Sequence, residues 1–387
     1  LGVQHDWGVV DGTWACIKAV GAVRTEIDRC RFEDSGGDGV RFDLDGWDNR
    51  VHRNEFVRLG GAAISLIGRP VGVRDNLHNN RIEANLVGHC AELWWLQPGI
   101  LVCQSSHNRI ADNRLHDLPY NGIALVGGRS ALFRKGRTSG PAADGLSYVN
   151  WDEVPAAVDE WHEKIGYVNT RDNLVEHNEI SAAVTRLGDG NGIYVSGTGP
   201  GNVLRRNYVH DIRSTAAAGG MRFDNDTWFC VMRENVVWNV SGASIVSKHV
   251  NTVENNILVN STVRGNLLLN SGPKWGGNVR RNLVVNRADV YLPTKSRWGK
   301  AEDILIRGEL AECLITDNLF FVPDDPELGV RVVETLNAQP GSRDNRHGDP
   351  GFVDLEHGDF SLRPGSAALD LGFIPFADYG PRGSVGR

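Results

Sequence analysis

Short stretches in which apolar and polar residues alternate recur along the chain, and glycines and asparagines separate them. A period of two is typical of β-strands that bury one face, whereas a helical repeat would place apolar residues three and four positions apart. We predict short strands where the chain has the form Gly-apolar-x-apolar. This form occurs at residues 39–43, 61–65, 99–103, 122–126, 192–196 and 220–224.

A second unit, Asn-x-(Ile/Val/Leu)-x-x-Asn-x-apolar, lies between these strands. Complete copies begin at Asn49, Asn80, Asn108, Asn173, Asn202 and Asn251, and weaker copies begin at Cys230, Gly277 and Cys313. The second asparagine recurs at steps of 21 to 36 residues, with one step of 65, a period typical of a solenoid. We expect the asparagines to occupy sharp turns, where they tolerate the left-handed conformation, and to hydrogen-bond the backbone of the next coil.

Together, the two units resemble the right-handed parallel β-helix proteins, the superfamily of pectate lyases and many polysaccharide hydrolases. We therefore expect an all-β fold, a single-stranded right-handed parallel β-helix (β-solenoid) of about ten coils, at residues 1–320. The step of 65 indicates an insertion at residues 130–170, with a helix-like stretch at 154–164. Residues 321–387 are expected to form an irregular C-terminal cap packed on this helix.

Four phrases support a narrower resemblance. They lie at residues 104–110, 113–123, 189–194 and 220–226. In this order they resemble the β-helix glycoside hydrolases of family 141, which include α-L-fucosidase and endoxylanase members. The resemblance covers nearly the whole chain and implies a glycoside hydrolase whose catalytic acid pair lies in the last two phrases. It also implies a further segment before Leu1, which would cover the open strand edge of the first coil.

The same two phrases contain the candidate catalytic residues. Strand alternation directs Arg222 and Asp224 outward, and on the preceding coil it directs Tyr194 outward, just after Asp189. Because neighbouring coils are about 4.8 Å apart, we expect one continuous outer patch. A glycosidase needs one protonated carboxyl group and one ionised carboxylate that acts as base or nucleophile. We therefore predict that Asp189 and Asp224 form the catalytic pair.

Other roles are open to both residues. Asp189 is also suited to cap the turn before Gly190, and Asp224 to pair with Arg222, in which case Asp226 is the substitute carboxylate. His116-Asp117 and His210-Asp211 occupy the same slot after two asparagine units, which favours a turn role, with His116 reaching the site as the alternative. The predicted substrate-binding residues are Tyr194, Arg222, Asp226, Lys248, His249, Trp94, Trp95, Tyr120 and His116.

Aromatic residues in loops are candidate platforms for sugar rings, which bind through their apolar faces. These residues are Trp94, Trp95 and Tyr120, with Trp151 and Trp161 in the insertion. The alternative is a small satellite core that holds the insertion against the solenoid. In that case the insertion would close one end of the groove and favour a short or branched substrate end.

The amino-acid composition excludes some kinds of binding partner. The chain has 48 acidic and 41 basic residues, a net charge of −7 and no basic run, which argues against nucleic acid. It has no apolar stretch long enough to span a membrane and no signal peptide. The six dispersed cysteines indicate buried, unpaired thiols, with no metal site and no obligatory cofactor. We expect a carbohydrate substrate, a monomer or small homo-oligomer, and a secreted or periplasmic location.

Two alternatives to a hydrolase remain open. Arg222, Asp224, Asp226 and Lys248 are also consistent with a β-helix polysaccharide lyase or epimerase that acts on a uronate. An unsaturated product, or loss of activity on chelation, would identify the lyase. The other alternative is a non-catalytic glycan-binding adhesin, such as a phage tail fibre.

Overall fold

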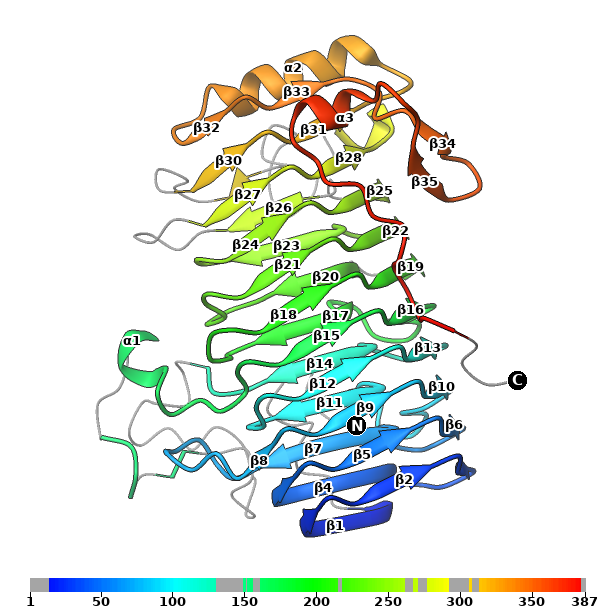
Figure 1. The fold of residues 1–387 in the computed structure, drawn as a ribbon, viewed down its shortest axis with the longest axis vertical. Helices are drawn as coiled ribbons and strands as arrows, with labels where there is room; N and C mark the ends of the chain where they lie inside the picture. The colour runs from blue at the N-terminus through cyan, green and yellow to red at the C-terminus, as the bar shows by residue number, and fades with distance from the viewer. Residues whose placement is uncertain are drawn as a thin grey trace.

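The computed structural model is a right-handed parallel β-helix, in which successive coils stack their strands into three long sheets (Figure 1). It describes residues 14–129, 149–150, 152–155, 161–214, 218–261, 267–270, 277–291, 306–307 and 313–383. Within these residues each of the three sheets has eleven strands. The predicted fold class is confirmed. Most of the predicted insertion, including Trp151, lies outside the described residues.

The three sheets are named A, B and C. Sheet A contains β1 (Ala15–Val23), β4 (Asp38–Trp47), β7 (Ile64–Gly68), β11 (Ile100–Cys103), β14 (Ile123–Val126), β17 (Asn191–Ser196), β20 (Gly219–Phe223), β23 (Ile245–Lys248), β26 (Leu267–Asn270) and β29 (Ile306–Arg307), with β8 (Leu77–His78) paired to β4. Sheet B contains β2 (Glu26–Asp28), β5 (Arg50–His52), β9 (Arg81–Glu83), β12 (Arg109–Ala111), β15 (Leu174–Glu176), β18 (Val203–Arg205), β21 (Val231–Arg233), β24 (Thr252–Glu254), β27 (Asn278–Arg280), β30 (Leu314–Thr316) and β32 (Ser342–Arg343). Sheet C contains β3 (Arg31–Glu33), β6 (Glu55–Val57), β10 (Leu86–Gly88), β13 (Arg114–His116), β16 (Glu179–Ser181), β19 (Tyr208–Ile212), β22 (Val236–Val240), β25 (Ile257–Ser261), β28 (Leu283–Val285), β31 (Leu319–Phe321) and β33 (Arg346–His347).

Inward side chains of sheet A stack from coil to coil. Ile193, Met221 and Ile245 occupy equivalent positions on β17, β20 and β23, and all three are fully buried. Burying an aliphatic side chain of this size stabilises a fold by about 1.5–3 kcal/mol. Tyr194 and Arg222 alternate with these residues and are paired in the same register. The register that builds the core therefore also aligns polar residues on the outside of the sheet.

A ladder of asparagines joins the coils between sheets B and C. The backbone N–H and Nδ2 of Asn113 donate to Oδ1 of Asn178 at 3.1 and 2.9 Å, and Asn178 makes the same two bonds to Asn207 at 3.1 and 3.0 Å. The predicted ladder is thus confirmed, but the left-handed residues are the ones before the asparagines, such as Asp112 (φ 58°) and His177 (φ 54°). The preceding residue makes the turn because the asparagine side chain must point into the stack to bond its neighbours.

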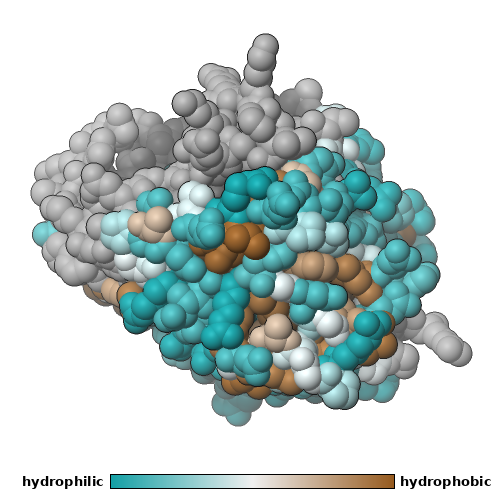
Figure 2. Space-filling view, turned by 90° about the horizontal axis from the view of Figure 1, so that it is seen from above, coloured by the Kyte–Doolittle hydropathy of each residue, from teal (hydrophilic) through white to brown (hydrophobic). Residues whose placement is uncertain are grey.

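Helix α2 (Pro326–Asn337) covers the C-terminal end of the β-helix (Figure 1). Asp325 caps its first turn by accepting a hydrogen bond of 2.9 Å from the backbone N–H of Leu328. Val333 and Leu336 are buried and join the main core. Seen from this end, the described surface is mostly hydrophilic with small hydrophobic patches, as suits an element that caps a solenoid (Figure 2).

The chain on either side of α2 still belongs to the stack. β32 and β33 continue sheets B and C beyond residue 320, where the sequence placed the start of the cap. The antiparallel hairpin of β34 (Phe352–Asp354) and β35 (Asp359–Leu362) and the short α3 (Ala367–Asp370) pack on the outer side of sheet C through a second apolar cluster. The other short helices are α1 (Trp161–Lys164) and η3 (Ala288–Tyr291).

Two further sequence predictions concern helices and thiols. No helix within the described residues has the length and apolar character needed to cross a bilayer. All six cysteines are free, which confirms the prediction of unpaired thiols. Their predicted burial is correct for only four of them, because Cys16 and Cys30 are exposed.

Candidate functional site

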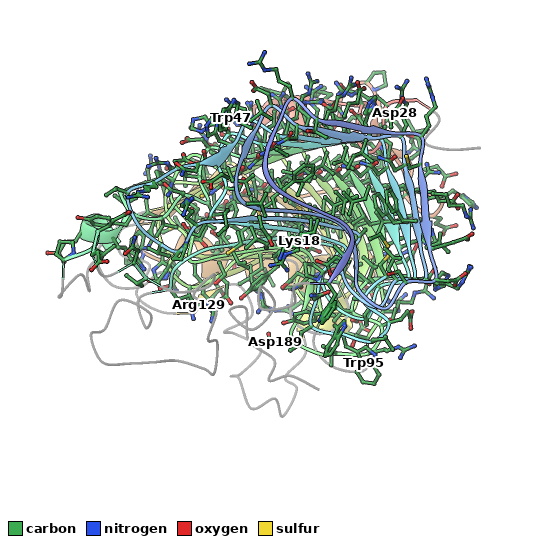
Figure 3. The ribbon with its side chains drawn as sticks, turned by 90° about the horizontal axis from the view of Figure 1, so that it is seen from below. Lys18, Asp28, Trp47, Trp95, Arg129 and Asp189 are labelled. Carbon is green, nitrogen blue, oxygen red and sulfur yellow. The ribbon has the colours of Figure 1, made fainter. Side chains whose placement is uncertain are left out.

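The predicted outer patch lies on sheet A, where β17, β20 and β23 run side by side. Tyr194 and Arg222 are direct partners on β17 and β20, Asp224 follows β20 by one residue, and Lys248 ends β23. Viewed along the β-helix, Arg129 and Asp189 lie on one side of the coils and Asp28 of sheet B lies on the opposite side (Figure 3). The polar residues of three consecutive coils thus meet on one face.

Asp224 is at the centre of this site and is only 6% exposed. Its Oδ2 accepts hydrogen bonds from the Tyr194 hydroxyl (2.7 Å) and from Nη2 of Arg129 (3.2 Å), and Lys248 forms an ion pair with its Oδ1. Burial alone would raise the pKa of the Asp224 carboxyl, but Lys248, Arg222 and Arg129 outweigh it and lower the pKa to about 2. Asp224 is therefore a carboxylate at any ordinary pH.

Asp189 differs from Asp224 in its exposure. Its side chain is 75% exposed, and its Oδ1 accepts a hydrogen bond of 2.9 Å from Nη1 of Arg222. The residue is left-handed (φ 57°), and its carbonyl accepts a bond of 3.3 Å from the Tyr120 hydroxyl. Burial opposes the charge of Arg222, but Asp224 and Asp189 together raise the pKa of its guanidinium. Arg222 therefore interacts electrostatically with both predicted catalytic carboxyl groups.

Arg129 is a member of the site that the sequence interpretation missed. It follows β14, and its Nε donates to Oγ of Ser196 (2.7 Å) while its Nη2 also donates to the Tyr194 hydroxyl. It lies at the border of the predicted insertion, so the alternation of strand residues did not include it. The signal that points to it is its place directly after Gly127 and Gly128, at the end of a strand that neighbours β17.

Asp226 and His249 lie next to this site but have other partners. Asp226 Oδ1 pairs with Nζ of Lys164 at 3.0 Å, and Lys164 is 3% exposed. The His249 ring stacks on Trp228 with centroids 4.4 Å apart. Burial lowers the pKa of His249 although Asp226 opposes the shift. These two residues therefore connect α1 and the turn after β20 to sheet A.

The ion pair with Arg222 that was the alternative role of Asp224 is replaced by other pairs. Asp224 is bonded directly to Lys248 and Arg129, and Arg222 is bonded to Asp189. The side chain of Arg222 faces Asp189 because that residue precedes β17, the neighbouring strand, in the turn.

The loop tryptophans Trp94 and Trp95 contact different coils. Trp95 lies on the same side of the coils as Asp189 (Figure 3), and the Arg186 guanidinium is 5.1 Å from the centre of its ring. Trp94 is 52% exposed, and its Nε1 donates to the Gly36 carbonyl at 3.3 Å. Both remain candidates for sugar stacking. The side chain of Trp161 lies outside the described part of the chain.

Two predicted substrate-binding residues require correction. Tyr120 is 7% exposed and belongs to the main core, so its ring has no free face for a sugar, and its hydroxyl supports the Asp189 backbone instead. The alternation of strand residues does not extend into the turn before Gly122, so it could not predict the direction of the Tyr120 side chain. His116 lies on β13 of sheet C, not on sheet A, because the second half of each asparagine unit forms sheet C.

A separate open hollow of about 710 Å³ lies beside Trp94, whose indole donates to the Gly36 carbonyl in its lining. It is lined by Asp34, Ser35, Gly36, Arg58, Gly60, His89, Glu92 and Leu93. None of the predicted catalytic or substrate-binding residues lines it.

No model of a known protein family matches the sequence, and no curated protein matches it. Solved structures with a similar fold include one titled "Glycoside hydrolase" (17% identity, TM-score 0.43, covering 66% of this chain and 36% of that chain). Another is a mutant tailspike protein of E. coli bacteriophage HK620 in complex with pentasaccharide (12% identity, TM-score 0.38, 85% of this chain and 55% of that chain). A third is a mannuronic acid specific polysaccharide family 6 lyase from human gut microbiota (14% identity, TM-score 0.38, 95% and 90%).

The chain spans about a third of the first of these structures and about half of the second. At these identities the similarity concerns the fold, which the strand pairing establishes on its own. Membership in glycoside hydrolase family 141 stays a prediction from the sequence phrases.

Proposed function

We propose that the chain is a carbohydrate-active enzyme, a glycoside hydrolase in which Asp224 is the base or nucleophile and Asp189 is the proton donor. One observation carries the proposal: Arg222 interacts with two carboxyl groups from neighbouring coils, of which one is buried and the other is 75% exposed. The lowered pKa of Asp224, about 2, supplies the ionised partner that glycoside hydrolysis requires. The exposure of Asp189 allows it to meet the leaving oxygen of a bound sugar.

Arg222 would also connect substrate binding to catalysis. In the absence of substrate its Nη1 is bonded to Asp189. A sugar hydroxyl that accepts this donor would release the Asp189 carboxyl to face the leaving oxygen as the general acid. Tyr194 and Arg129 would hold Asp224 in place throughout, since both donate to its Oδ2.

The substrate class that we propose is a plant or microbial glycan with an α-L-fucoside or xylan-like linkage. The ordered phrases that resemble family 141 support this choice, as does Trp95, whose ring lies 5.1 Å from the guanidinium of Arg186, just before Asp189 in the chain. The hydrolytic mechanism requires no cofactor. Because a polymeric glycan is met outside the cytoplasm, we expect a secreted or periplasmic protein.

Hydrolysis of aryl glycosides and plant polysaccharides, including α-L-fucosides and xylan, tests the proposal. Asp189→Asn and Asp224→Asn are each expected to lower kcat/KM by at least about 10³-fold, as the loss of a catalytic carboxyl does. Asp211→Asn is a matched control, because Asp211 is also left-handed (φ 51°) but lies on sheet C. Thermal unfolding should be measured for all three variants, since Asp224 is buried among cations.

Release of sugar at near-wild-type rates by both variants would contradict this site. Binding of glycans without any cleavage would favour an adhesin.

A lyase that acts on a uronate is the second candidate, and the cations around Asp224 favour it. Lys248, Arg129 and Arg222 all lower the pKa of that carboxyl, and together they provide charges that would neutralise a uronate carboxylate. Lys248 or Tyr194 would then abstract the proton. An unsaturated product that absorbs in the near ultraviolet, with activity lost in Lys248→Gln but kept in Asp189→Asn, would identify the lyase.

A further inference from the structure

Two histidines and an aspartate meet where two neighbouring strands of sheet C, β10 and β13, end. β10 and β13 pair so that Gly88 lies opposite His116, and the next residues, His89 and Asp117, are both left-handed (φ 53°). One donor atom from each of His89, His116 and Asp117 lies within 4.8 Å of the other two. The contacts include 2.8 Å from Nδ1 of His116 to Oδ2 of Asp117 and 3.9 Å from Nε2 of His89 to the same oxygen.

The backbone of the adjacent coil makes room for His116. A Cβ atom at Gly88 would lie 2.6 Å from Cε1 and 2.8 Å from Nε2 of the His116 ring, so any larger residue would displace the imidazole. The His89 and His116 rings are perpendicular, with centroids 5.9 Å apart. Because Gly88 has no side chain, the His116 ring can lie close to the coil that carries His89.

We infer that His89, His116 and Asp117 bind a divalent transition-metal ion of the zinc class. Two imidazoles and one carboxylate, with a position left for water, form a donor set that Zn²⁺ accepts at about 2.0–2.2 Å. Donors at the corners of such a tetrahedron lie roughly 3.3 Å apart, between the two distances of 2.8 and 3.9 Å seen here. The side chains are 53%, 34% and 46% exposed, so small rotations suffice to complete the site.

The same slot on a later coil provides an internal comparison. His210 and Asp211 form the same pair at 2.9 Å, but the residue that corresponds to His89 one coil earlier is Ala182. That slot therefore lacks the second imidazole. A surface His–Asp pair alone is common, and it is the added His89 that distinguishes the proposed site.

A second group of possible ligands, Glu26, Asp28 and His52, is less suitable. Both Asp28 oxygens already bind Arg53, at 2.7 and 2.6 Å. A metal ion would have to displace this guanidinium. No such cation contacts Asp117 among the ion pairs of the described residues, where its partners are His89 and His116.

An ion at this site would join two consecutive coils, because His89 comes from one and His116 and Asp117 from the next. An ion that binds only the folded protein raises its stability by RT ln(1 + [L]/Kd), so the gain increases with the logarithm of the ion concentration. Imidazole ligands favour Zn²⁺ and Ni²⁺ over Mg²⁺ and Ca²⁺. We therefore expect Zn²⁺ to raise the Tm of the whole chain, and Mg²⁺ and Ca²⁺ to leave it unchanged.

Titration calorimetry of the full chain with Zn²⁺ tests the inference. One equivalent should bind to the wild type and to the matched control His210→Ala, and binding should weaken at least about tenfold in His89→Asn and His116→Ala. Asparagine is chosen at position 89 because it accepts the left-handed backbone. Gly88→Ala should weaken binding as well, because it displaces the His116 ring.

Unchanged Zn²⁺ binding in both His89→Asn and His116→Ala would overturn the inference, as would an equal loss in His210→Ala. Absence of binding at millimolar Zn²⁺ would also overturn it. The rise in Tm with Zn²⁺ provides a second readout and should disappear in His89→Asn. Neither measurement depends on glycan cleavage, so the proposed function can fail without affecting this result.

Discussion

The hydroxyl group of Tyr194 donates a hydrogen bond of 2.7 Å to the carboxylate of Asp224, across neighbouring strands of sheet A. Both side chains are almost fully buried, at 3% and 6% exposure. A hydrogen bond to a charged group in such a place contributes about 1.5–3 kcal/mol. The bond thus fixes the position and charge of the one carboxylate that the proposed mechanism requires to be ionised.

Tyr194→Phe removes this bond with little change in shape. We expect kcat/KM on the cleaved glycan to fall about 10- to 100-fold, since 1.36 kcal/mol corresponds to a factor of ten. Tyr208→Phe, on sheet C, is the control and should retain wild-type kinetics. Equal rates in wild type and Tyr194→Phe would show that Asp224 needs no support from the phenol.

Lys248→Gln should change the pH dependence of the reaction. The pKa of Asp224 lies below its usual value because its cations outweigh burial, so removing Lys248 raises that pKa. The acidic limb of kcat/KM then moves to higher pH. Lys18→Gln is a matched control on the same sheet, because Lys18 pairs with Asp43 at 3.0 Å. An acidic limb that stays in place would exclude Asp224 as the titrating base.

Asp38 should make folding stability depend on pH in the opposite sense from Asp224. Burial raises the pKa of Asp38 to about 6, although Ser65, Arg41 and the Ala62 N–H oppose the shift. Asp38 therefore contributes its full stabilisation at pH values below its pKa in the unfolded chain, which is near 4. As the pH rises through 6, on the order of 3 kcal/mol of folding stability is lost.

Asp38→Asn removes the charge and keeps the bond from the Ala62 N–H to Oδ1, while the Ser65 hydroxyl, which donates to Oδ2 in the wild type, becomes the acceptor for the new Nδ2. Urea unfolding from pH 4 to 8 should show this loss of stability in the wild type and a flatter profile in the variant. Asp45→Asn is the contrasting control, because the Arg69 hydrogen bond lowers the pKa of Asp45 and outweighs burial. A wild-type profile that is flat over this range would contradict the assignment.

Asn178→Ala tests the asparagine ladder in the middle of the stack. The change removes the acceptor for two donors of Asn113 and leaves buried groups without partners, each costing about 1–3 kcal/mol. We expect the free energy of unfolding to fall by at least about 3 kcal/mol. Asn76→Ala, which loses one partly buried bond to Asp45, should cost about 1 kcal/mol. Equal losses would mean that the ladder adds no special stability.

The β-helix could be predicted from the sequence because its repeat is local. Glycines, asparagines and alternating apolar residues mark every coil, and strand register follows from them. That register also brought Tyr194, Arg222 and Asp224 together correctly. Arg129 and the pairing of Lys248 with Asp224 were not foreseen in detail, because long side chains reach across coils in directions that a strand pattern does not set.

The direction of side chains in turns was the second feature that could not be predicted from the sequence. Tyr120 lies in the core, in the bend before Gly122, where the alternation of strand residues no longer predicts the direction of a side chain. The proposed metal site escaped the sequence interpretation for a related reason. His89 and His116 are 27 positions apart, and they become neighbours only because each follows an asparagine unit at the same corner.

A second asparagine ladder precedes the strands of sheet B, and it affects how such a chain can evolve. Asn108 bonds Asn173 across 65 positions of sequence at 3.0 Å, and Asn173 bonds Asn202 across 29 positions at 3.1 Å. The distance between neighbouring coils is thus the same whether a short or a long loop connects them. Doubling the length of a flexible loop adds only about 0.6 kcal/mol of closure entropy. Segments beside the site can therefore be exchanged or lengthened while Asp189, Arg222 and Asp224 keep their places, so under the proposed function substrate preference and catalytic geometry would evolve separately.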